Sequence, residues 1–239
     1  MSEQISVICI IGKAHSGKDT AGKMIADASD GVVLAFADKL KAICAEMFGL
    51  SREDLYTEDG KNRKTNLPSF RCPSPGCGSF RVLPWKPDDA PRGFYATSYT
   101  CEACGTVGEK KLFVSSWTPR MILQHVGTEG FRAISPNVWA DYALRVARRE
   151  LLKGKRLVVF TDGRFRSECE RVWQAGGEVW RIKRDGANGN VGIAGHASET
   201  EQDNIRDDEC QVVIENNGTL GDLQRVLQTS LGQFWTRRP

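Results

Sequence analysis

The sequence predicts an α/β fold, in which a five-stranded parallel sheet flanked by helices carries a small, turn-rich insert. Three observations support this prediction. Short apolar runs alternate with helical patterns in both halves of the chain, as in doubly wound sheets. A glycine-rich loop joins the first apolar run to the first helical pattern. Between the two halves of the chain, residues 56–117 hold six of the nine prolines and four of the eight cysteines, without a sustained helical period.

The loop in residues 7–20, VICIIGKAHSGKDT, has the spacing of a phosphate-binding loop, G-x-x-x-x-G-K. Gly12 and Gly17 permit tight curvature and a close approach of the backbone to phosphate oxygens. Lys18 would begin a helix whose N-terminus favours negative charge, and it would reach the β- and γ-phosphates of a nucleotide. Asp19 occupies the usual place of a magnesium-binding hydroxyl, and Thr20 follows one residue later. The simpler alternative is a glycine-rich strand-to-helix turn.

The other elements follow from apolar patterns and their flanking residues. Strands are expected at residues 32–37, 155–162, 178–183 and 211–215. Helices are expected at residues 20–28, 38–48, 137–152, 165–174 and 219–231, and after the Thr118-Pro119 pair. The glycine-rich, polar residues 184–197 predict a loop. The predicted α/β core therefore comprises residues 1–55 and 118–239, and the predicted insert comprises residues 56–117.

Composition excludes several classes of protein. Of the 239 residues, 40% are hydrophobic and 26% are charged, which is ordinary for a globular protein. The net charge of +3 is too small to argue for nucleic-acid binding. No apolar run approaches the ~18 residues of a membrane span, and MSEQ followed by a strand is not a secretory signal. We therefore expect a cytoplasmic protein, of the host cell if the chain is viral, without a membrane partner.

Clustered cysteines in the insert predict a structural zinc site. Cys72 and Cys77 form one close pair, and Cys101 and Cys104 form another. Four thiolates give the closed tetrahedral shell of structural Zn²⁺, and a small segment needs such a staple. Two disulfides or four separate thiols are the alternatives. The remaining cysteines are expected to be small core residues: Cys9, Cys44, Cys169 and Cys210.

The charges of the insert are mixed. Its basic residues include Arg63, Lys64, Arg71, Arg81, Lys86 and Arg92, and its acidic residues include Glu58, Asp59, Asp88 and Asp89. This balance is typical of a solvated surface rather than of a nucleic-acid footprint. A nucleotide-dependent nucleic-acid-binding module that uses the zinc ribbon remains the alternative from another class.

Two further groups of residues could complete a phosphate-transfer site. Asp162 ends a predicted strand, at the edge where open α/β sheets bind ligands, and it could hold magnesium directly or through water. Its simpler interpretation is a helix cap. Arg164 could neutralise phosphate charge or form a surface ion pair. Arg120 and Arg132 suggest a second phosphate site, because arginine can bind phosphate with two hydrogen bonds.

Five segments, taken in order, resemble the bacteriophage-type deoxynucleoside monophosphate kinase family. These segments are GKAHSGKDT, FADKLKAICAEMFGL, TPRMILQHVGTEGFRAISPNVW, VVFTDGRFRSE and HASETEQD…VVIENNGTLGDL. The resemblance covers nearly the whole chain outside residues 56–117. It implies a P-loop kinase fold and transfer of the ATP γ-phosphate, with Mg²⁺, to a deoxynucleoside 5′-monophosphate. The GKDT ending, with Asp19, is normal in this family.

The resemblance also implies roles for individual residues. ATP phosphates would be held by Lys13, Ala14, His15, Ser16, Gly17, Lys18, Asp19 and Thr20. The acceptor nucleotide would be contacted by Arg120, Gln124, Glu129 and Arg132, with Asp38 and Lys39 nearby. Catalysis would rest on Lys18, Asp162, Arg164 and Arg184. Arg184 opens a segment, residues 184–200, that resembles the kinase lid.

Two features differ from the family's pattern. Gly163 stands where a β-branched residue is more usual, and the cysteine-bearing insert is longer than the usual connection. P-loop kinases for other small acceptors, of the dephospho-coenzyme A or phosphomevalonate type, remain alternatives. The sequence leaves open the preferred base and the oligomeric state, a homodimer included.

Overall fold

The computed structural model describes residues 5–70, 72–77, 79, 82–84, 98–109, 114–187 and 204–238. The chain divides into two compact units. The first unit comprises Met1–Ile43 and Val126–Pro239, and the second comprises Cys44–His125. The expected insert, residues 56–117, lies within the second unit, and its boundaries as a separate domain stay a prediction.

A five-stranded sheet forms the centre of the first unit, in the order β10-β9-β1-β8-β2. Every neighbouring pair is parallel, which confirms the predicted sheet. The strands are β1 (Val7–Ile11), β2 (Val32–Leu34), β8 (Val158–Gly163), β9 (Glu178–Lys183) and β10 (Val212–Glu215). Because β1 lies between β8 and β9, the loop after β1 emerges between the ends of these two strands.

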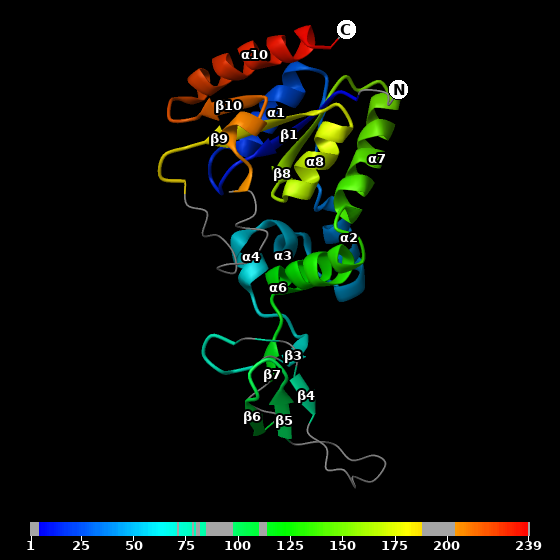
Figure 1. Ribbon diagram of the computed structural model, residues 1–239, viewed down its shortest axis with the longest axis vertical. Coiled ribbons are helices and arrows are strands. Elements are labelled where there is room, and N and C mark those ends of the chain that lie inside the picture. The colour runs from blue at the N-terminus through cyan, green and yellow to red at the C-terminus, as the bar shows by residue number, and fades with distance from the viewer. Residues whose placement is uncertain are drawn as a thin grey trace. The chain divides into compact units, whose positions relative to one another are not determined.

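Both faces of the sheet are covered by helices (Figure 1). Successive residues of a strand point to opposite faces. Val7, Cys9 and Ile11 therefore belong to one core cluster, which includes residues of α7 and α8. Ile8 and Ile10 belong to the other, which includes residues of α1 and α10. All five residues of β1 are buried, as a central parallel strand requires.

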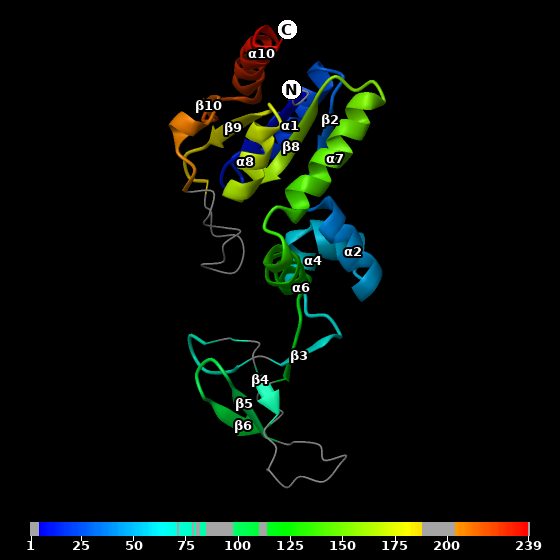
Figure 2. The same ribbon diagram turned by 45° about the vertical axis from the view of Figure 1, so that its right-hand side comes forward.

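The helices of the first unit lie close to the predicted ranges. They are α1 (Lys18–Ala28), α7 (Val138–Leu152), α8 (Arg166–Gln174) and α10 (Leu220–Thr236), with a short 3₁₀ helix at Asp207–Glu209. Helix α2 (Asp38–Phe48) crosses the boundary between the units. Figure 2 shows β2 at the edge of the sheet, beside α7.

Strand β2 is shorter than the predicted range of residues 32–37. It ends at Leu34, because the next backbone amides take another acceptor. The amides of Phe36 and Ala37 donate to the carboxylate of Asp162. The strand therefore ends three residues earlier than predicted, whereas α2 begins at Asp38 as expected.

In its described part, the second unit contains three short helices besides the end of α2: α3 (Arg52–Tyr56), α4 (Glu58–Asn62) and α6 (Pro119–Gln124). Residues 56–117 are predicted to be rich in turns without a sustained helical period, and α4 is a single short helix within this stretch. The Thr57 side chain caps this helix by accepting from the Gly60 amide. Gly60 has no room for a side chain, since an added Cβ would lie 2.2 Å from the Glu53 carbonyl oxygen. A single capped turn is too short to show a helical period.

The described part of the second unit also contains β structure. Strands β3 (Pro68–Phe70) and β7 (Val114–Ser116) pair antiparallel. Strands β4 (Val82–Pro84), β5 (Ser98–Cys101) and β6 (Val107–Glu109) form a three-stranded antiparallel sheet. Apolar residues between the two cysteine pairs predict short strands of a ribbon. Val82 and Tyr99 lie in β4 and β5, whereas Phe80 and Tyr95 lie outside the described residues.

The helical stretch expected after Pro119 changes its geometry. Helix α6 gives way to a π-helix, η1 (His125–Arg132). In the first unit, the Trp139 indole nitrogen donates to the Gly127 carbonyl oxygen at 3.0 Å, which ties η1 to α7. Such π-type turns are rare and are often found at functional sites.

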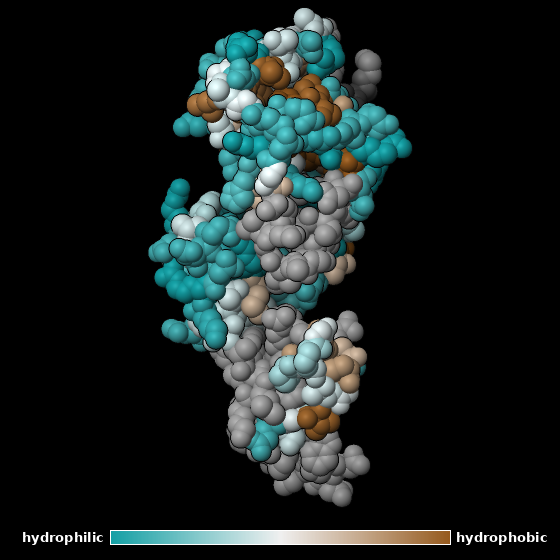
Figure 3. Space-filling model, turned by 90° about the vertical axis from the view of Figure 1, so that its left-hand side faces the viewer, coloured by the Kyte–Doolittle hydropathy of each residue, from teal (hydrophilic) through white to brown (hydrophobic). Residues whose placement is uncertain are grey.

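The face shown in Figure 3 is mostly hydrophilic, and its apolar side chains lie in separate areas. On β10 and α10, the exposed large apolar residues are Val213, Leu220 and Val226. Within the described part of the chain, no helix has the length and apolar character needed to cross a bilayer.

Candidate functional site

The loop between β1 and α1 has the backbone conformation that its glycines allow. Gly12 and Gly17 have φ angles of +148° and +100°, in the region that favours glycine. At Gly12 an added Cβ would also lie 2.2 Å from the Ile182 carbonyl oxygen. Gly12 is therefore required by both conformation and space, and Gly17 by conformation, which argues against an incidental glycine-rich turn.

Lys18 is the first residue of α1, and its side chain folds back over the loop. Its Nζ donates to the carbonyl oxygens of Gly12 and Lys13, at 2.6 and 2.7 Å. The ammonium group is therefore held above the loop, at the positive end of the helix dipole. Asp19 and Thr20 follow on the first turn of α1, and both are exposed.

Ser16 is the buried residue of the loop. Its residue exposure is 0%, and its Oγ has no hydrogen-bond partner among the described residues. Its carbonyl oxygen accepts from the Asn216 side chain at 2.8 Å, so the residue after β10 supports the loop. A buried hydroxyl without a partner is costly, and a bound phosphate oxygen would satisfy it.

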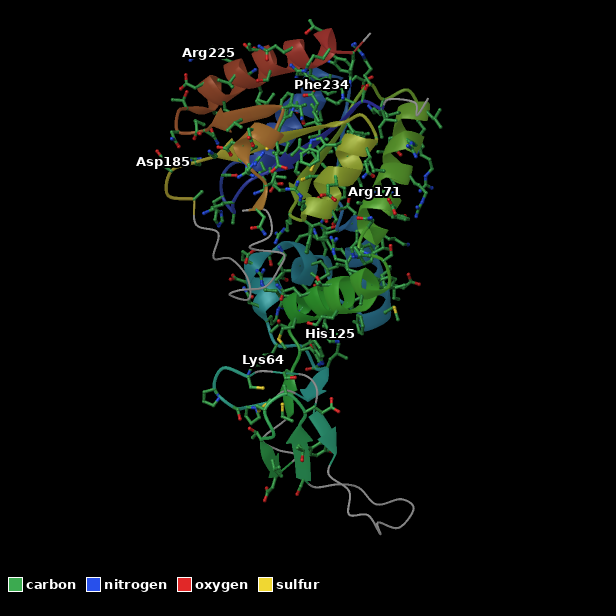
Figure 4. The ribbon with its side chains drawn as sticks, in the orientation of Figure 1. Lys64, His125, Arg171, Asp185, Arg225 and Phe234 are labelled. Atoms are coloured by element: carbon green, nitrogen blue, oxygen red, sulfur yellow. The ribbon has the colours of Figure 1, made fainter. Side chains whose placement is uncertain are left out.

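A cleft of about 390 Å³ adjoins the loop. Its lining comes from the loop, from the ends of β9 and β10, and from the start of the following loop. The lining residues are Gly12, Lys13, Ser16, Arg181, Ile182, Lys183, Arg184, Asp185, Gly186, Ala187 and Glu215. Four are basic and two are acidic, which gives the cleft a net positive charge suited to phosphate. Arg184 and Asp185 are exposed, and Figure 4 labels Asp185 beyond the end of β9.

Asp162 lies near the end of β8 and is tied to the turn after β2. Its two carboxylate oxygens accept from the amides of Phe36 and Ala37, at 2.8 and 3.0 Å. Burial raises the pKa of the Asp162 carboxyl, although these two bonds act in the opposite direction. The helix-cap interpretation placed Asp162 at the start of α8, but its partners are the amides before α2. This arrangement holds Asp38 and Lys39, which are both exposed, at the start of α2.

Arg132 ends η1, and its guanidinium is held inside the first unit. Its Nη2 lies 2.5 Å from the Glu168 carboxylate, and its Nη1 donates to the Pro136 carbonyl oxygen at 3.1 Å. The guanidinium also covers the Phe165 ring at 3.7 Å. Arg132 is therefore rigidly placed, and its contact with an acceptor stays a prediction. Glu129 and Arg164 are exposed in the same unit.

Arg120 belongs to the second unit, where it is held by α4. Its Nη2 lies 2.6 Å from the Glu58 carboxylate, and its Nε donates to the Asn62 side chain at 3.0 Å. The Oε1 of Gln124 is buried and has no partner among the described residues. An acceptor nucleotide could supply a donor to this oxygen. The predicted meeting of these residues with the loop of the first unit stays a prediction.

The four cysteines of the second unit form one cluster. Their Sγ atoms all lie within 4.8 Å of one another. The Sγ atoms of Cys72 and Cys104 are 3.6 Å apart, and those of Cys77 and Cys101 are 3.7 Å apart. Four sulfurs at about 2.3 Å from a tetrahedral Zn²⁺ would be separated by about 3.8 Å. The donor set therefore fits zinc, and the distances exclude disulfides.

Two tight turns present these thiols. Gly76 and Gly105 have φ angles of +78° and +71°, the conformation that allows each turn to close. The Cys77 amide donates to the Ser74 carbonyl oxygen, and the Gly105 amide donates to that of Cys101. Both turns therefore have a backbone shape that brings two thiols to one point. Cys9, Cys44 and Cys169 are fully buried, as expected for core residues, whereas Cys210 is half-buried.

Sequence reasoning did not assign roles to several residues that support the site. Asn216 directly follows the last strand, at the edge where parallel strands end together, and this position was a usable signal. Glu168 follows Phe165 by three residues, the spacing of a capping box. Glu58 and Asn62, by contrast, reach Arg120 only through tertiary packing.

Comparison with known proteins gives one curated relative of interest. This viral protein, from Acanthamoeba polyphaga mimivirus, is described as "Putative deoxynucleotide monophosphate kinase". It is 27% identical to this chain over 223 residues, which are 90% of each protein. The relative confirms the predicted resemblance to this kind of kinase. No family model matches the chain.

Two solved structures show weak overall similarity. Shikimate kinase from Acinetobacter baumannii, in complex with shikimate, is 13% identical, with a TM-score of 0.41 over 99% of this chain and 96% of that one. TT1252 from Thermus thermophilus is 15% identical, with a TM-score of 0.44 over 97% and 98% of the two chains. These scores are too low to support an argument about the fold, which follows from the order and direction of the chain's own strands.

Proposed function

We propose that this chain is an ATP-dependent phosphotransferase that converts a deoxynucleoside monophosphate to the diphosphate. The main observation in support of this proposal is the loop between Gly12 and Lys18. It combines two required glycines, a lysine held over the backbone, and a buried Ser16 hydroxyl without a partner. The viral relative, similar over 90% of the chain, supports the choice of acceptor.

The loop would bind the phosphates of ATP. Its backbone amides and the N-terminus of α1 supply fixed positive partial charges for phosphate oxygens. Lys18 would leave the carbonyl oxygens of Gly12 and Lys13 and turn to the transferring group. Lys13 and Arg184 line the adjoining cleft and would add positive charge. The role of residues 184–200 as a lid belongs to this proposal, and residues 188–200 lie outside the described residues.

Two arginines would bind the acceptor's phosphate. Arg132 and Arg120 are each fixed by a glutamate, and both side chains are mostly buried. Guanidinium groups held in this way lose little conformational freedom when they bind phosphate. Gln124, Glu129, Asp38 and Lys39 would contact the rest of the acceptor nucleotide.

The reaction needs no covalent intermediate. An acceptor phosphate oxygen, already anionic, would attack the γ-phosphorus in line, while the bond to the β-phosphate oxygen breaks. Lys18, Arg164 and the loop amides would stabilise the charge that spreads over the transferring group. The same loop would stabilise the negative charge that develops on the leaving diphosphate.

Magnesium bound with ATP would screen the charge of the β- and γ-phosphates. Asp162 is the residue proposed to hold it. Both carboxylate oxygens of Asp162 already accept an amide, but each oxygen can accept more than one bond. These contacts favour a water-mediated role over direct binding.

Structural zinc is the second part of the proposal. Cys72, Cys77, Cys101 and Cys104 would hold one Zn²⁺ in a closed shell, so the metal would not activate water. The cluster lies in a unit with few long elements, where a metal would supply much of the stability. The zinc would therefore support the fold of the second unit rather than the chemistry.

The test is ATP consumption with each of the four deoxynucleoside monophosphates. We expect turnover with at least one of them, and a loss of about 100-fold or more in Lys18→Ala. Lys23→Ala is the matched control, because Lys23 is an exposed lysine on the same helix. Transfer only to dephospho-coenzyme A or phosphomevalonate would overturn the acceptor assignment. Near-native turnover of Lys18→Ala would overturn the phosphate-loop assignment.

A further inference from the structure

One buried carboxylate in the first unit has no role in the proposed chemistry. The Glu168 side chain is 3% exposed and lies on the first turn of α8. Its Oε1 binds Arg132, and its Oε2 accepts from the amides of Arg164 and Phe165, at 2.8 and 3.1 Å. A single side chain thus joins the end of η1 to the turn that follows β8.

A capping role alone does not account for these contacts. Capping needs only the Oε2 atom, which serves the two amides of the turn. The second oxygen faces the guanidinium of Arg132, whose side chain is only 11% exposed. Burying such an ion pair is costly, and replacement by apolar residues is often neutral or stabilising. Stability is therefore a weak reason for this pair, and placement of the arginine is a better one.

The contacts around Arg132 fix the orientation of its guanidinium. Glu168 binds one nitrogen, the Pro136 carbonyl oxygen accepts from another, and the Phe165 ring packs against the guanidinium at 3.7 Å. Three contacts of different kinds restrict both the position of the guanidinium and the tilt of its plane. Phosphate binding through two hydrogen bonds depends on that plane.

We propose that Glu168 is a positioning residue, which sets Arg132 to bind the phosphate of the acceptor nucleotide. The inference rests on the proposed function and extends it, since Glu168 would act on the acceptor through Arg132. The same carboxylate holds the Arg164–Phe165 turn, which directly follows Asp162 and Gly163. Glu168 therefore links the acceptor arginine to the end of β8, where the transferring phosphate is expected.

The experiment is a double-mutant cycle on acceptor kinetics. Glu168→Gln removes the charge and keeps the shape, and Arg132→Ala removes the phosphate-binding group. We expect Glu168→Gln to raise the acceptor KM about tenfold, while the KM for ATP changes less than about twofold. The double variant should be no worse than Arg132→Ala alone, because Glu168 acts through the arginine.

Glu178→Gln is the matched control. Glu178 is also a buried glutamate bound by arginines, but it begins β9, at the end of the sheet opposite the loop. This variant should lose thermal stability and keep the wild-type acceptor KM. A merely structural role for Glu168 would give the same pattern in Glu168→Gln, and that result would overturn the inference.

A second variant covers the case in which Glu168→Gln does not fold. Phe165→Leu removes the ring beneath the guanidinium and leaves the carboxylate in place, so it should also raise the acceptor KM. An unchanged acceptor KM in this variant, or additive effects in the cycle, would count against the inference. Failure of the proposed function has a different signature, because wild-type protein would then transfer phosphate to none of the four acceptors.

Discussion

Gly163, the last residue of β8, lies where a side chain has no room. An added Cβ would be 2.5 Å from the Cys9 Sγ and 2.9 Å from the Ile11 Cγ2. The β-branched residue that is more usual at this place would collide with the central strand. The departure from the family's pattern is thus matched by the neighbouring residues of β1, and it leaves the Asp162 contacts intact.

Gly163→Ala should destabilise the protein by about 1–3 kcal/mol, because the added methyl group overpacks the sheet. The measurement is urea unfolding followed by circular dichroism. Gly232→Ala is the control, since nothing lies within 4 Å of a Cβ added there and the residue is helical. The control should be neutral or slightly stabilising. A Gly163→Ala protein as stable as wild type would show that β1 shifts at little cost to make room for the added methyl group.

At the scale of elements, the two cysteine turns of the second unit act together. Each turn has its own backbone hydrogen bonds, and the Ser74 and Thr106 hydroxyls, 2.5 Å apart, join them. Antiparallel β4, β5 and β6 add only short strands. Such small sheets rarely persist alone, so the metal would decide whether these elements form.

We expect one zinc ion per chain in protein purified without chelators. Metal content by mass spectrometry should fall to background in a Cys101→Ser/Cys104→Ser variant. Chelation should remove the β signal of the second unit in circular dichroism and leave the parallel sheet folded, because the two units have separate cores. Cys9→Ser offers a comparison, as its thiol lies in the core of the first unit. Wild-type protein without stoichiometric metal, or a double variant that retains zinc, would contradict the assignment.

At the scale of the first unit, the two ends of the parallel sheet have different roles. The carboxyl ends of β1, β8 and β9 present the loop, Asp162 and the cleft. At the opposite end, Glu178 accepts from Arg237 and Arg238 near the C-terminus, and from the Trp180 indole nitrogen. These contacts fasten the end of α10 to the sheet, away from the proposed chemistry.

This cluster should make stability depend on acid. Burial would raise the pKa of Glu178, but hydrogen bonds from Arg237, Trp180 and Arg238 outweigh it and hold the pKa below its usual range. A carboxylate with a lowered folded pKa stabilises the protein above its unfolded pKa, and this stabilisation is lost as pH falls through the folded value. At pH 7, Glu178→Gln should therefore be less stable than wild type by about 1–3 kcal/mol.

The measurement is thermal unfolding of both proteins between pH 7 and pH 3. The difference should be constant near neutrality and shrink below pH 4.5, the ordinary pKa of a glutamate. Glu170→Gln is the control, because Glu170 is exposed on α8. A difference that stays the same at pH 3 would show that shape, rather than charge, accounts for the effect.

Local patterns were sufficient to predict the parallel sheet and its loop. Buried parallel strands need continuous apolar runs, such as Val7–Ile11. Each run can be recognised in the sequence without knowledge of the strands that pair with it. The glycine-rich loop is also local, since Gly12 and Gly17 serve a backbone conformation within one short segment. The cysteine cluster follows for the same reason, because each close pair is presented by a single turn.

Contacts between distant segments could be decided only by tertiary structure. The sequence shows Asp162 at a strand end, but its partners Phe36 and Ala37 are more than one hundred residues away. The sequence predicts Arg132 as a phosphate ligand, but only the folded structure shows Glu168 and Phe165 around its guanidinium. Partner choice between remote side chains depends on how the helices pack on the sheet. Residue type alone therefore predicts which groups are present, and packing decides which of them meet.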